Sequence, residues 1–188
     1  MLPNPDEKLD PRVKRTRGLI LTSFENLLAE KVFESISVQD VTDKAQVNRA
    51  TFYAHFQDKY ALLDYSISQM FKQEIEKRTL NACTYSADNL RNLILAVCEF
   101  LSNIHSGCAQ PHQQFESLVE GTIKNIVFDL LSHWLRKSKV PTEIPATVAT
   151  WAIYGLASHY SHMKKRPTLE KFVDEAYPLV AVNLEQFA

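Results

Sequence analysis

Apolar residues recur along much of this chain at intervals of three and four positions, the spacing of one face of an α-helix. The most informative stretch is residues 37–56, whose apolar positions are Val38, Val41, Ala45, Val47, Phe52 and Phe56. This pattern predicts two short helices joined by a tight turn that carries an apolar residue. Ser37 and Asp40 match a capping box for the first helix, and Asn48 suits the N-cap of the second.

Longer helices are predicted on both sides of this pair. A helix over residues 12–31 is indicated by apolar residues at helical spacing, namely Ile20, Phe24, Leu27 and Leu28. Asp58 is expected to begin a helix to about Leu80. Its apolar residues lie along one side: Leu62, Leu63, Ile67, Met70, Phe71 and Ile75.

The rest of the chain predicts four further helices. The first is capped by Ser86 and stopped at Ser106-Gly107. The second runs from about Phe115 into the basic run 136–139. The third follows a break at 142–145 and ends near Lys165, and the last starts at Leu169 and is kinked or interrupted near Pro178.

Composition agrees with an all-helical chain. Only four glycines occur in 188 residues, and we find no sustained alternating run with hairpin turns. With 45% hydrophobic and 23% charged residues, the chain resembles a soluble globular protein of one or two domains. The charged, proline-rich N-terminus and the short apolar stretch 148–157 predict no membrane span, so we expect a cytoplasmic protein.

The distribution of charge favours a nucleic-acid partner although the net charge is −1. Near the N-terminus, basic residues follow one another without an intervening acid: Arg12, Lys14, Arg15 and Arg17. Arg49 and Lys59 add positive charge in or beside the second short helix. The polar residues 48–55 should face outwards on a helix short enough to enter a major groove end-first.

Several short motifs in this region occur together: Ser37-Val38, Asp40-Val41, Ala45-Gln46-Val47, Thr51-Phe52-Tyr53, His55-Phe56 and Lys59. With them, the segment from about Arg15 to Leu63 resembles the DNA-binding domain of the TetR family of bacterial transcriptional regulators. Two positions depart from the family pattern, since Gln46 and Ala50 stand where Gly is usual or frequent. If residue 46 needs a positive φ, glutamine there costs about 1 kcal/mol.

The fold implied by the resemblance is all-α. An N-terminal three-helix helix-turn-helix DNA-binding domain is joined by a long helix to a C-terminal helical dimerisation and effector body. We expect a flexible N-terminus at 1–11, the DNA-binding domain at 12–57 and the regulatory and dimerisation domain at 58–188, with 58–80 as the connecting helix. The expected function is sequence-specific transcriptional regulation, most simply repression, by a homodimer on a near-palindromic double-stranded DNA operator that an effector releases.

The expected DNA contacts divide by chemistry. Tyr53, His55 and Lys59 resemble the family's phosphate-contacting positions, with Arg15 and Arg17 as further candidates. Asn48, Arg49 and Thr51 are better placed to touch base edges, where Arg49 could pair with guanine and Thr51 could meet a thymine methyl group. The complete predicted set is Arg15, Arg17, Ser37, Asn48, Arg49, Thr51, Tyr53, His55 and Lys59.

The last two predicted helices carry more apolar surface than one chain of this size can cover, which favours self-association. The predicted dimer interface is Val148, Trp151, Gly155, His159, Phe172, Val173, Ala176 and Val180. The resemblance also implies an effector pocket in the body. Its candidate aromatic residues, each of which could equally be a packing residue, are Phe100, Phe115, Phe128, Trp134, Trp151 and Tyr154.

No cofactor or metal site is predicted. His159 and His162 are three positions apart, but no acidic residue at matching spacing accompanies them. Cys83, Cys98 and Cys108 are an odd number without metal-type spacing, which suits free thiols in a reducing compartment and leaves a redox role open.

The alternative functions are less well supported. An enzyme is disfavoured because the chain has no glycine-rich phosphate loop, nucleophile elbow or convincing acid–base pair. A helical protein-interaction module remains an alternative, as does a regulator controlled by a partner protein instead of a small molecule. Activation instead of repression is also left open.

Overall fold

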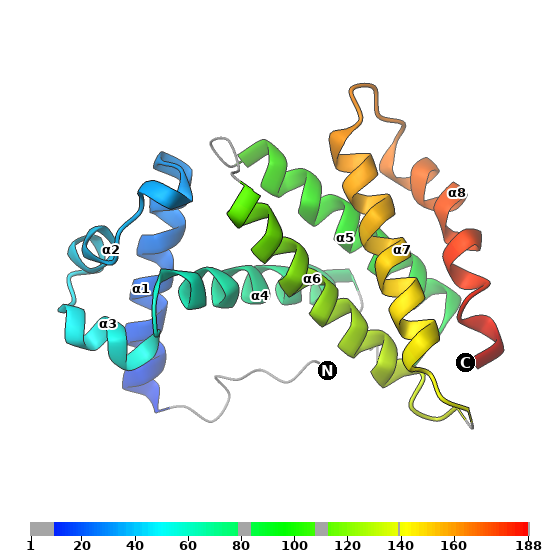
Figure 1. Ribbon diagram of the computed structural model, residues 1–188, viewed down its shortest axis with the longest axis horizontal. Coiled ribbons are helices and arrows are strands. Elements are labelled where there is room, and N and C mark those ends of the chain that lie inside the picture. The colour runs from blue at the N-terminus through cyan, green and yellow to red at the C-terminus, as the bar shows by residue number, and fades with distance from the viewer. Residues whose placement is uncertain (1–9, 79–83, 108–112, 139, 188) are drawn as a thin grey trace. The chain divides into compact units, whose positions relative to one another are not determined.

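The computed structural model describes residues 10–78, 84–107, 113–138 and 140–187, and these residues form helices joined by turns (Figure 1). The α-helices are α1 (Pro11–Glu30), α2 (Val38–Ala45), α3 (Arg49–His55), α4 (Lys59–Arg78), α5 (Ala87–Gly107), α6 (Gln113–Trp134), α7 (Glu143–His162) and α8 (Leu169–Ala181). Two short 3₁₀ segments are η1 (Phe33–Ser35) and η2 (Glu185–Phe187). No strand occurs in these ranges, and the all-α prediction is confirmed.

Two compact units divide the chain. The described part of the first, here called the N-terminal unit, extends to Ile67 and includes part of residues 107–119. The second, the C-terminal unit, contains described residues of 68–106 and 120–188. Helix α4 runs continuously from the first unit into the second. The N-terminal unit therefore contains the first turns of α4 and of α6 in addition to the predicted domain 12–57.

The N-terminal unit has a small aromatic core. Phe24 and Phe52 are fully buried, and Phe33 is nearly so. The rings of Phe24 and Phe33 meet edge to face at 6.2 Å between centroids, and Phe115 from the first turn of α6 lies 6.2 Å from Phe33. Each such side chain contributes about 1.5–3 kcal/mol by leaving water, and together they hold α2 and α3 on α1.

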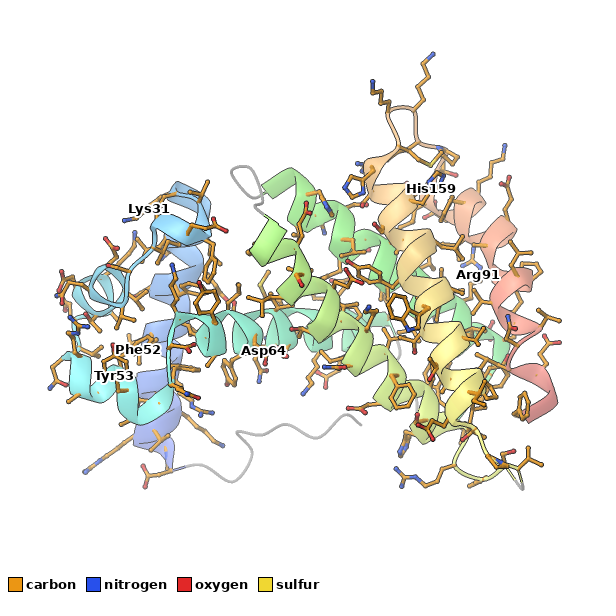
Figure 2. The ribbon with its side chains drawn as sticks, viewed as in Figure 1. Lys31, Phe52, Tyr53, Asp64, Arg91 and His159 are labelled. Carbon is orange, nitrogen blue, oxygen red and sulfur yellow. The ribbon has the colours of Figure 1, made fainter. Side chains whose placement is uncertain are left out.

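The C-terminal unit is organised around α5, whose residues 93–98 are all buried. Phe71 of α4 packs against Phe100 with ring centroids 5.0 Å apart, and Arg91 forms an ion pair with Asp174 of α8 at 2.7 Å (Figure 2). Ser86 caps α5 as predicted, since its Oγ accepts a hydrogen bond from the Asn89 amide at 3.1 Å.

Several predicted helix ends differ from the observed ones. Helix α6 stops at Trp134, so residues 136–138 of the basic run lie outside the helix, in a turn where the Ser138 amide donates to the Leu135 carbonyl at 2.9 Å. Lys139 lies outside the described residues. Helix α7 starts at Glu143, and it accepts Pro145 because a first-turn residue needs no amide donor. It ends at His162, before Lys165. Helix α8 continues through Pro178 to Ala181 and is not interrupted.

The described part of the chain contains no helix with the length and apolar character needed to cross a membrane.

Candidate nucleic-acid interface

Helices α2 and α3 form a helix-turn-helix whose first helix is capped as predicted. The Asp40 amide donates to Ser37 Oγ at 3.1 Å, and the Ser37 amide donates to the Asp40 carboxylate at 2.8 Å. Lys31, the residue that follows α1, also donates to the Asp40 carboxylate at 2.8 Å. Hydrogen bonds from Lys31 and then Ser37 hold the pKa of Asp40 well below its usual range. Ser37 thus has a structural role at the start of α2.

The turn between the two helices contains the backbone conformation that glycine usually provides. Gln46 has φ 54° and ψ 41°, and it is the only non-glycine residue with a positive φ among those described. The next amide, that of Val47, donates to the Thr42 carbonyl at 3.0 Å and closes the end of α2. The side chain of Gln46 is exposed just before the start of α3 and is therefore a further candidate for contact with DNA. The sequence pattern had pointed only to the backbone conformation of this residue.

Helix α3 begins with the predicted asparagine cap. Asn48 Oδ1 accepts from the Thr51 amide at 2.7 Å and from the Thr51 hydroxyl at 2.9 Å, which fixes the Thr51 side chain. Phe52 is fully buried, whereas Tyr53 is 49% exposed (Figure 2). The Arg49 guanidinium donates to the Tyr53 hydroxyl at 3.4 Å. Arg49, Tyr53 and the half-buried Thr51 therefore form the polar outer face of α3.

Lys59 has a role different from the expected phosphate contact. Its ammonium donates to three backbone carbonyls around η1, those of Phe33 at 3.2 Å, Glu34 at 3.0 Å and Ile36 at 2.9 Å. It also lies 4.7 Å from the centre of the Phe33 ring. Because an ammonium has three donors, these bonds use its full capacity. Lys59 fastens the start of α4 to the segment before α2.

Arg17 is likewise directed into the N-terminal unit, which differs from its predicted contact with DNA. Its guanidinium lies 5.4 Å from the Phe56 ring centre and 5.1 Å from that of Tyr65, a cation–π arrangement. It also donates to the His55 carbonyl at 3.5 Å. Arg17 therefore braces the end of α3 against α1 and α4, while Arg15 is exposed two positions earlier.

His55 is half-buried at the end of α3. Burial, and then the positive charge of Arg17, lower the pKa of its imidazole. The neutral ring is thereby favoured near pH 7, and a neutral ring contributes hydrogen bonding but no net charge to a phosphate contact.

The predicted interface residues of the last helices separate into two groups. Val148, Trp151, Gly155 and His159 of α7 are exposed in the single chain, and Phe172 of α8 is half-buried. Val173, Ala176 and Val180 are buried within the chain itself, so assigning these three to a dimer surface was wrong. They lie on the inner face of α8, whereas Leu179 of this helix and Val182, the residue that follows it, are exposed.

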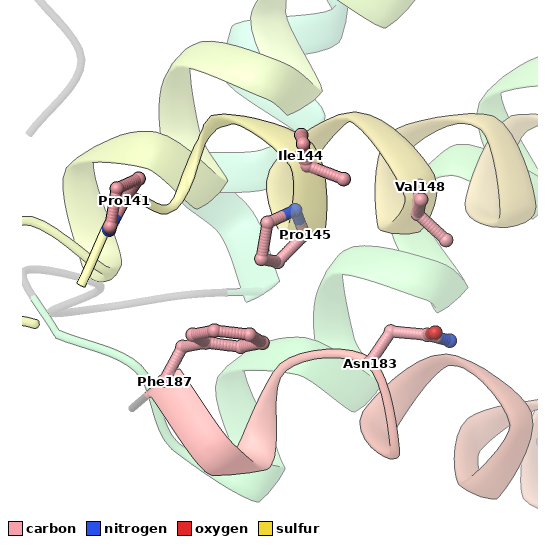
Figure 3. A pocket seen from close by; sticks show the side chains of 6 residues that line it. All are labelled: Pro141, Ile144, Pro145, Val148, Asn183 and Phe187. Atoms are coloured by element: carbon pink, nitrogen blue, oxygen red, sulfur yellow. The ribbon is translucent and has the colours of Figure 1, made fainter.

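The exposed apolar face of α7 continues into a cavity of about 360 Å³ beside the C-terminal segment (Figure 3). Its lining residues are Pro141, Ile144, Pro145, Val148, Asn183 and Phe187. Figure 3 shows Ile144 and Pro145 on α7, with Phe187 on the facing segment. None of the predicted effector-pocket aromatics lines this cavity.

Those aromatic candidates differ in their surroundings among the described residues. Phe115 belongs to the core of the N-terminal unit through its contact with Phe33, and Trp151 is 58% exposed beneath the Lys124 ammonium, 3.4 Å from its ring centre. The others lie in the C-terminal unit: Phe100 and Trp134 are buried, and Phe128 and Tyr154 are half-buried. Phe115 is thus a packing residue of the N-terminal unit, whereas Trp151 lies at the surface of the chain.

The arrangement defines a class of protein: a helix-turn-helix with a polar outer face on its second helix, followed by a helical body. Residues 20–65 match the model of the bacterial regulatory proteins, tetR family. The chain therefore carries the N-terminal domain of the TetR family.

Two curated relatives share this region. The chain is 36% identical over 76 residues to the uncharacterized HTH-type transcriptional regulator YxbF of Bacillus subtilis. The aligned residues make up 40% of this chain and 20% of that protein. It is 32% identical over 60 residues to DhaS of Lactococcus lactis, the HTH-type dhaKLM operon transcriptional activator, covering 32% of each. The matches thus span about a fifth and a third of these relatives.

Solved structures extend the likeness of fold over nearly the whole chain. The TetR-family regulator SCO0857 of Streptomyces coelicolor is 16% identical with a TM-score of 0.64, and the match covers 97% of this chain and 98% of that one. Lin0861 of Listeria innocua is 18% identical with a TM-score of 0.65, covering 93% and 94%. At these identities the likeness establishes the shared all-helical fold.

Proposed function

We propose that this chain is a sequence-specific DNA-binding transcriptional regulator that acts as a homodimer. The observation that carries the proposal is the outer face of α3, where Arg49, Thr51 and Tyr53 project from a helix capped by Asn48 and anchored by the buried Phe52. A short, well-anchored helix with such a face suits insertion into the major groove.

Within this face we assign base reading to Arg49, Thr51 and the Asn48 amide group, with Gln46 as a further contact from the turn. Arg49 is suited to the two acceptors of guanine, and the Thr51 methyl group to thymine. Tyr53 and Arg15 are assigned to phosphates. Lys59 and Arg17 position these elements because their cationic groups are engaged within the N-terminal unit.

The homodimer is supported by apolar side chains that one chain leaves uncovered. Ile144, Val148 and Trp151 follow one another at helical spacing on α7 and are 76%, 44% and 58% exposed. Leu179 on α8 and Val182, just after this helix, are 65% and 66% exposed. An exposed apolar face of this kind is costly to leave in water. If a second copy of the chain covers it, the dimer presents two α3 helices to a near-palindromic operator.

Gly155 supports the same face. It is exposed, and a Cβ atom added there would meet nothing within 4 Å in the single chain. Its small size is therefore not required by packing inside the chain, whereas a second helix crossing at this point would approach more closely over glycine.

Regulation by an effector is proposed for the C-terminal unit. Two solved structures of similar fold contain small molecules. FadR of Bacillus subtilis, which matches this chain with a TM-score of 0.55, is in complex with stearoyl-CoA. RolR, with a TM-score of 0.57, is in complex with resorcinol. An effector would need to favour the non-binding arrangement by about 1–3 kcal/mol. For the effect of DNA binding on transcription, repression is our first proposal. Activation is the second, because DhaS is named an activator.

The test is selection of bound duplexes from a random DNA pool, followed by gel shifts at fixed salt concentration. We expect a two-fold related consensus, and Arg49→Ala should lose about 1–3 kcal/mol of discrimination at one base pair in each half-site. Lys77→Ala, which removes an exposed basic side chain of α4 outside both proposed interfaces, is the matched control. If no sequence is enriched and the chain also fails to bind heparin, the DNA-binding proposal is wrong and the protein-interaction module is favoured.

A further inference from the structure

Two histidines from different helices of the C-terminal unit meet at a single point. His105 is in the last turn of α5 and His162 in the last turn of α7. Their ring centroids are 4.5 Å apart with the planes at 70°. Both imidazoles are accessible, His162 being exposed and His105 half-buried.

The same ring nitrogen of each histidine is held by its own helix. His105 Nδ1 lies 2.7 Å from the Leu101 carbonyl oxygen, and His162 Nδ1 lies 2.8 Å from that of Ser158. A carbonyl oxygen can only accept a hydrogen bond, so Nδ1 must carry the proton in both rings. In a neutral imidazole this leaves the lone pair on Nε2.

This is the arrangement in which backbone carbonyls orient histidines that bind metals, by fixing both the tautomer and the ring plane. We propose that His105 and His162 bind one divalent transition-metal ion, Zn²⁺, through their Nε2 atoms, with water completing the coordination. Imidazole is a preferred ligand of zinc and of its neighbours in the series.

The spacing of the two rings is compatible with this site. Ring nitrogens of the two residues lie within 4.8 Å of each other. A tetrahedral zinc ion with Zn–N bonds of about 2.0–2.1 Å holds two nitrogens about 3.4 Å apart, which a modest rotation of the exposed His162 side chain would provide. Bound metal would join the ends of α5 and α7. The inference concerns the C-terminal unit and does not depend on DNA binding.

The first experiment is calorimetric titration of ZnCl₂ into the full chain, with Cys83→Ser and Cys108→Ser introduced so that thiolates do not compete. We expect one equivalent of zinc to bind, and His105→Ala or His162→Ala to weaken binding about tenfold or more. His133→Ala is the control, because that imidazole lies near Arg136 at the end of α6. Binding that is equally tight after both histidines are replaced would overturn the proposal.

The second experiment uses the unmodified histidines, so it is independent of whether a variant folds. Long-range ¹H–¹⁵N spectra of the metal-free chain should show His105 and His162 in the Nδ1–H tautomer, and zinc should shift their Nε2 resonances and not that of His133. Zinc should also raise the midpoint of thermal unfolding by about 5–10 °C at one hundred times Kd. Unperturbed Nε2 resonances at saturating zinc would refute the site.

Discussion

Lys59 donates a hydrogen bond from its ammonium group to the carbonyl oxygen of Ile36 at 2.9 Å. This bond joins the first turn of α4 to the residue that precedes the N-cap of α2. The same ammonium also serves the carbonyls of Phe33 and Glu34. Burial lowers the pKa of Lys59. Through its three hydrogen bonds, the ammonium group of Lys59 orders the backbone segment that precedes the helix-turn-helix.

Replacing Lys59 with methionine should destabilise the chain, because three carbonyls lose a charged donor while most of the side-chain volume is kept. We expect the free energy of unfolding to fall by about 1–3 kcal/mol, measured by urea denaturation. DNA affinity should fall with it, but the slope of log affinity against log salt should not change, since no phosphate contact is removed.

Arg15→Ala is the comparison for that measurement. Arg15 is exposed on α1, so stability should stay within about 0.5 kcal/mol, while the salt slope should fall by about 1. A reduced slope for Lys59→Met at unchanged stability would instead return Lys59 to the phosphate-contacting role.

Gln46→Gly should stabilise the chain by about 0.5–1 kcal/mol, because glycine adopts the observed φ of 54° without steric cost. Urea denaturation of Gln46→Gly against Gln46→Ala measures this, and the alanine variant should be close to neutral. If the glutamine side chain contacts a base, the glycine variant should also bind the operator more weakly. Destabilisation by glycine would show that the side chain contributes more than the strain costs.

Sequence reasoning succeeded where interactions are local. The caps at Ser37 and Asn48 connect residues three positions apart, and their partners follow from the backbone geometry of a helix start. It did not anticipate the partners of Lys59, which lie 23 to 26 positions earlier, or those of Arg17, which are Phe56 after α3 and Tyr65 of α4. Such roles depend on how helices pack, which no local pattern encodes.

The same limit explains the last two helices. Periodicity identified apolar residues on α8 but not which of its two apolar sides faces inwards, so the buried Val173 and Val180 were assigned to the surface. The contact between His105 and His162 was likewise beyond reach. Only the spacing within one helix was available, and it paired His162 with His159 instead of with His105.

Thr51 offers a test of base reading through two nearly isosteric changes. Thr51→Val keeps a methyl group but removes the hydroxyl that donates to Asn48 Oδ1, and Thr51→Ser keeps the hydroxyl but removes the methyl. If the methyl contacts thymine, serine should lose about 1 kcal/mol of preference at one base pair while valine retains it. Competition gel shifts with operators altered at that pair measure this. Equal effects on every operator would remove Thr51 from base reading.

Cys98 should be chemically inert in the folded chain. Burial raises the pKa of its thiol to about 12, so only about 10⁻⁴ of it is thiolate at pH 8. In a chain carrying Cys83→Ser and Cys108→Ser, Ellman's reagent should react with Cys98 only when urea unfolds the protein. Stoichiometric reaction under native conditions would keep a redox role open for this residue. The other two cysteines lie outside the described residues.

Trp151 should be the main energetic contributor to the proposed dimer. Its indole is 58% exposed in the single chain, yet the Lys124 ammonium, itself paired with Glu120 at 2.7 Å, holds one face of the ring. A large aromatic side chain that is ordered before association loses little entropy when it is covered. Trp151→Ala should therefore weaken dimerisation by about 2 kcal/mol, or about 30-fold in Kd, by sedimentation equilibrium.

The control for Trp151 is Leu19→Ala, an equally simple truncation of an exposed apolar residue, here on α1 and 50% exposed. It should leave the dimer Kd unchanged, because α1 has no part in the proposed interface. Circular dichroism should show both variants fully helical, so that a change in association is not mistaken for unfolding. If Leu19→Ala dissociates the dimer and Trp151→Ala does not, the two copies pair through the N-terminal unit, and the interface on α7 and α8 is wrong.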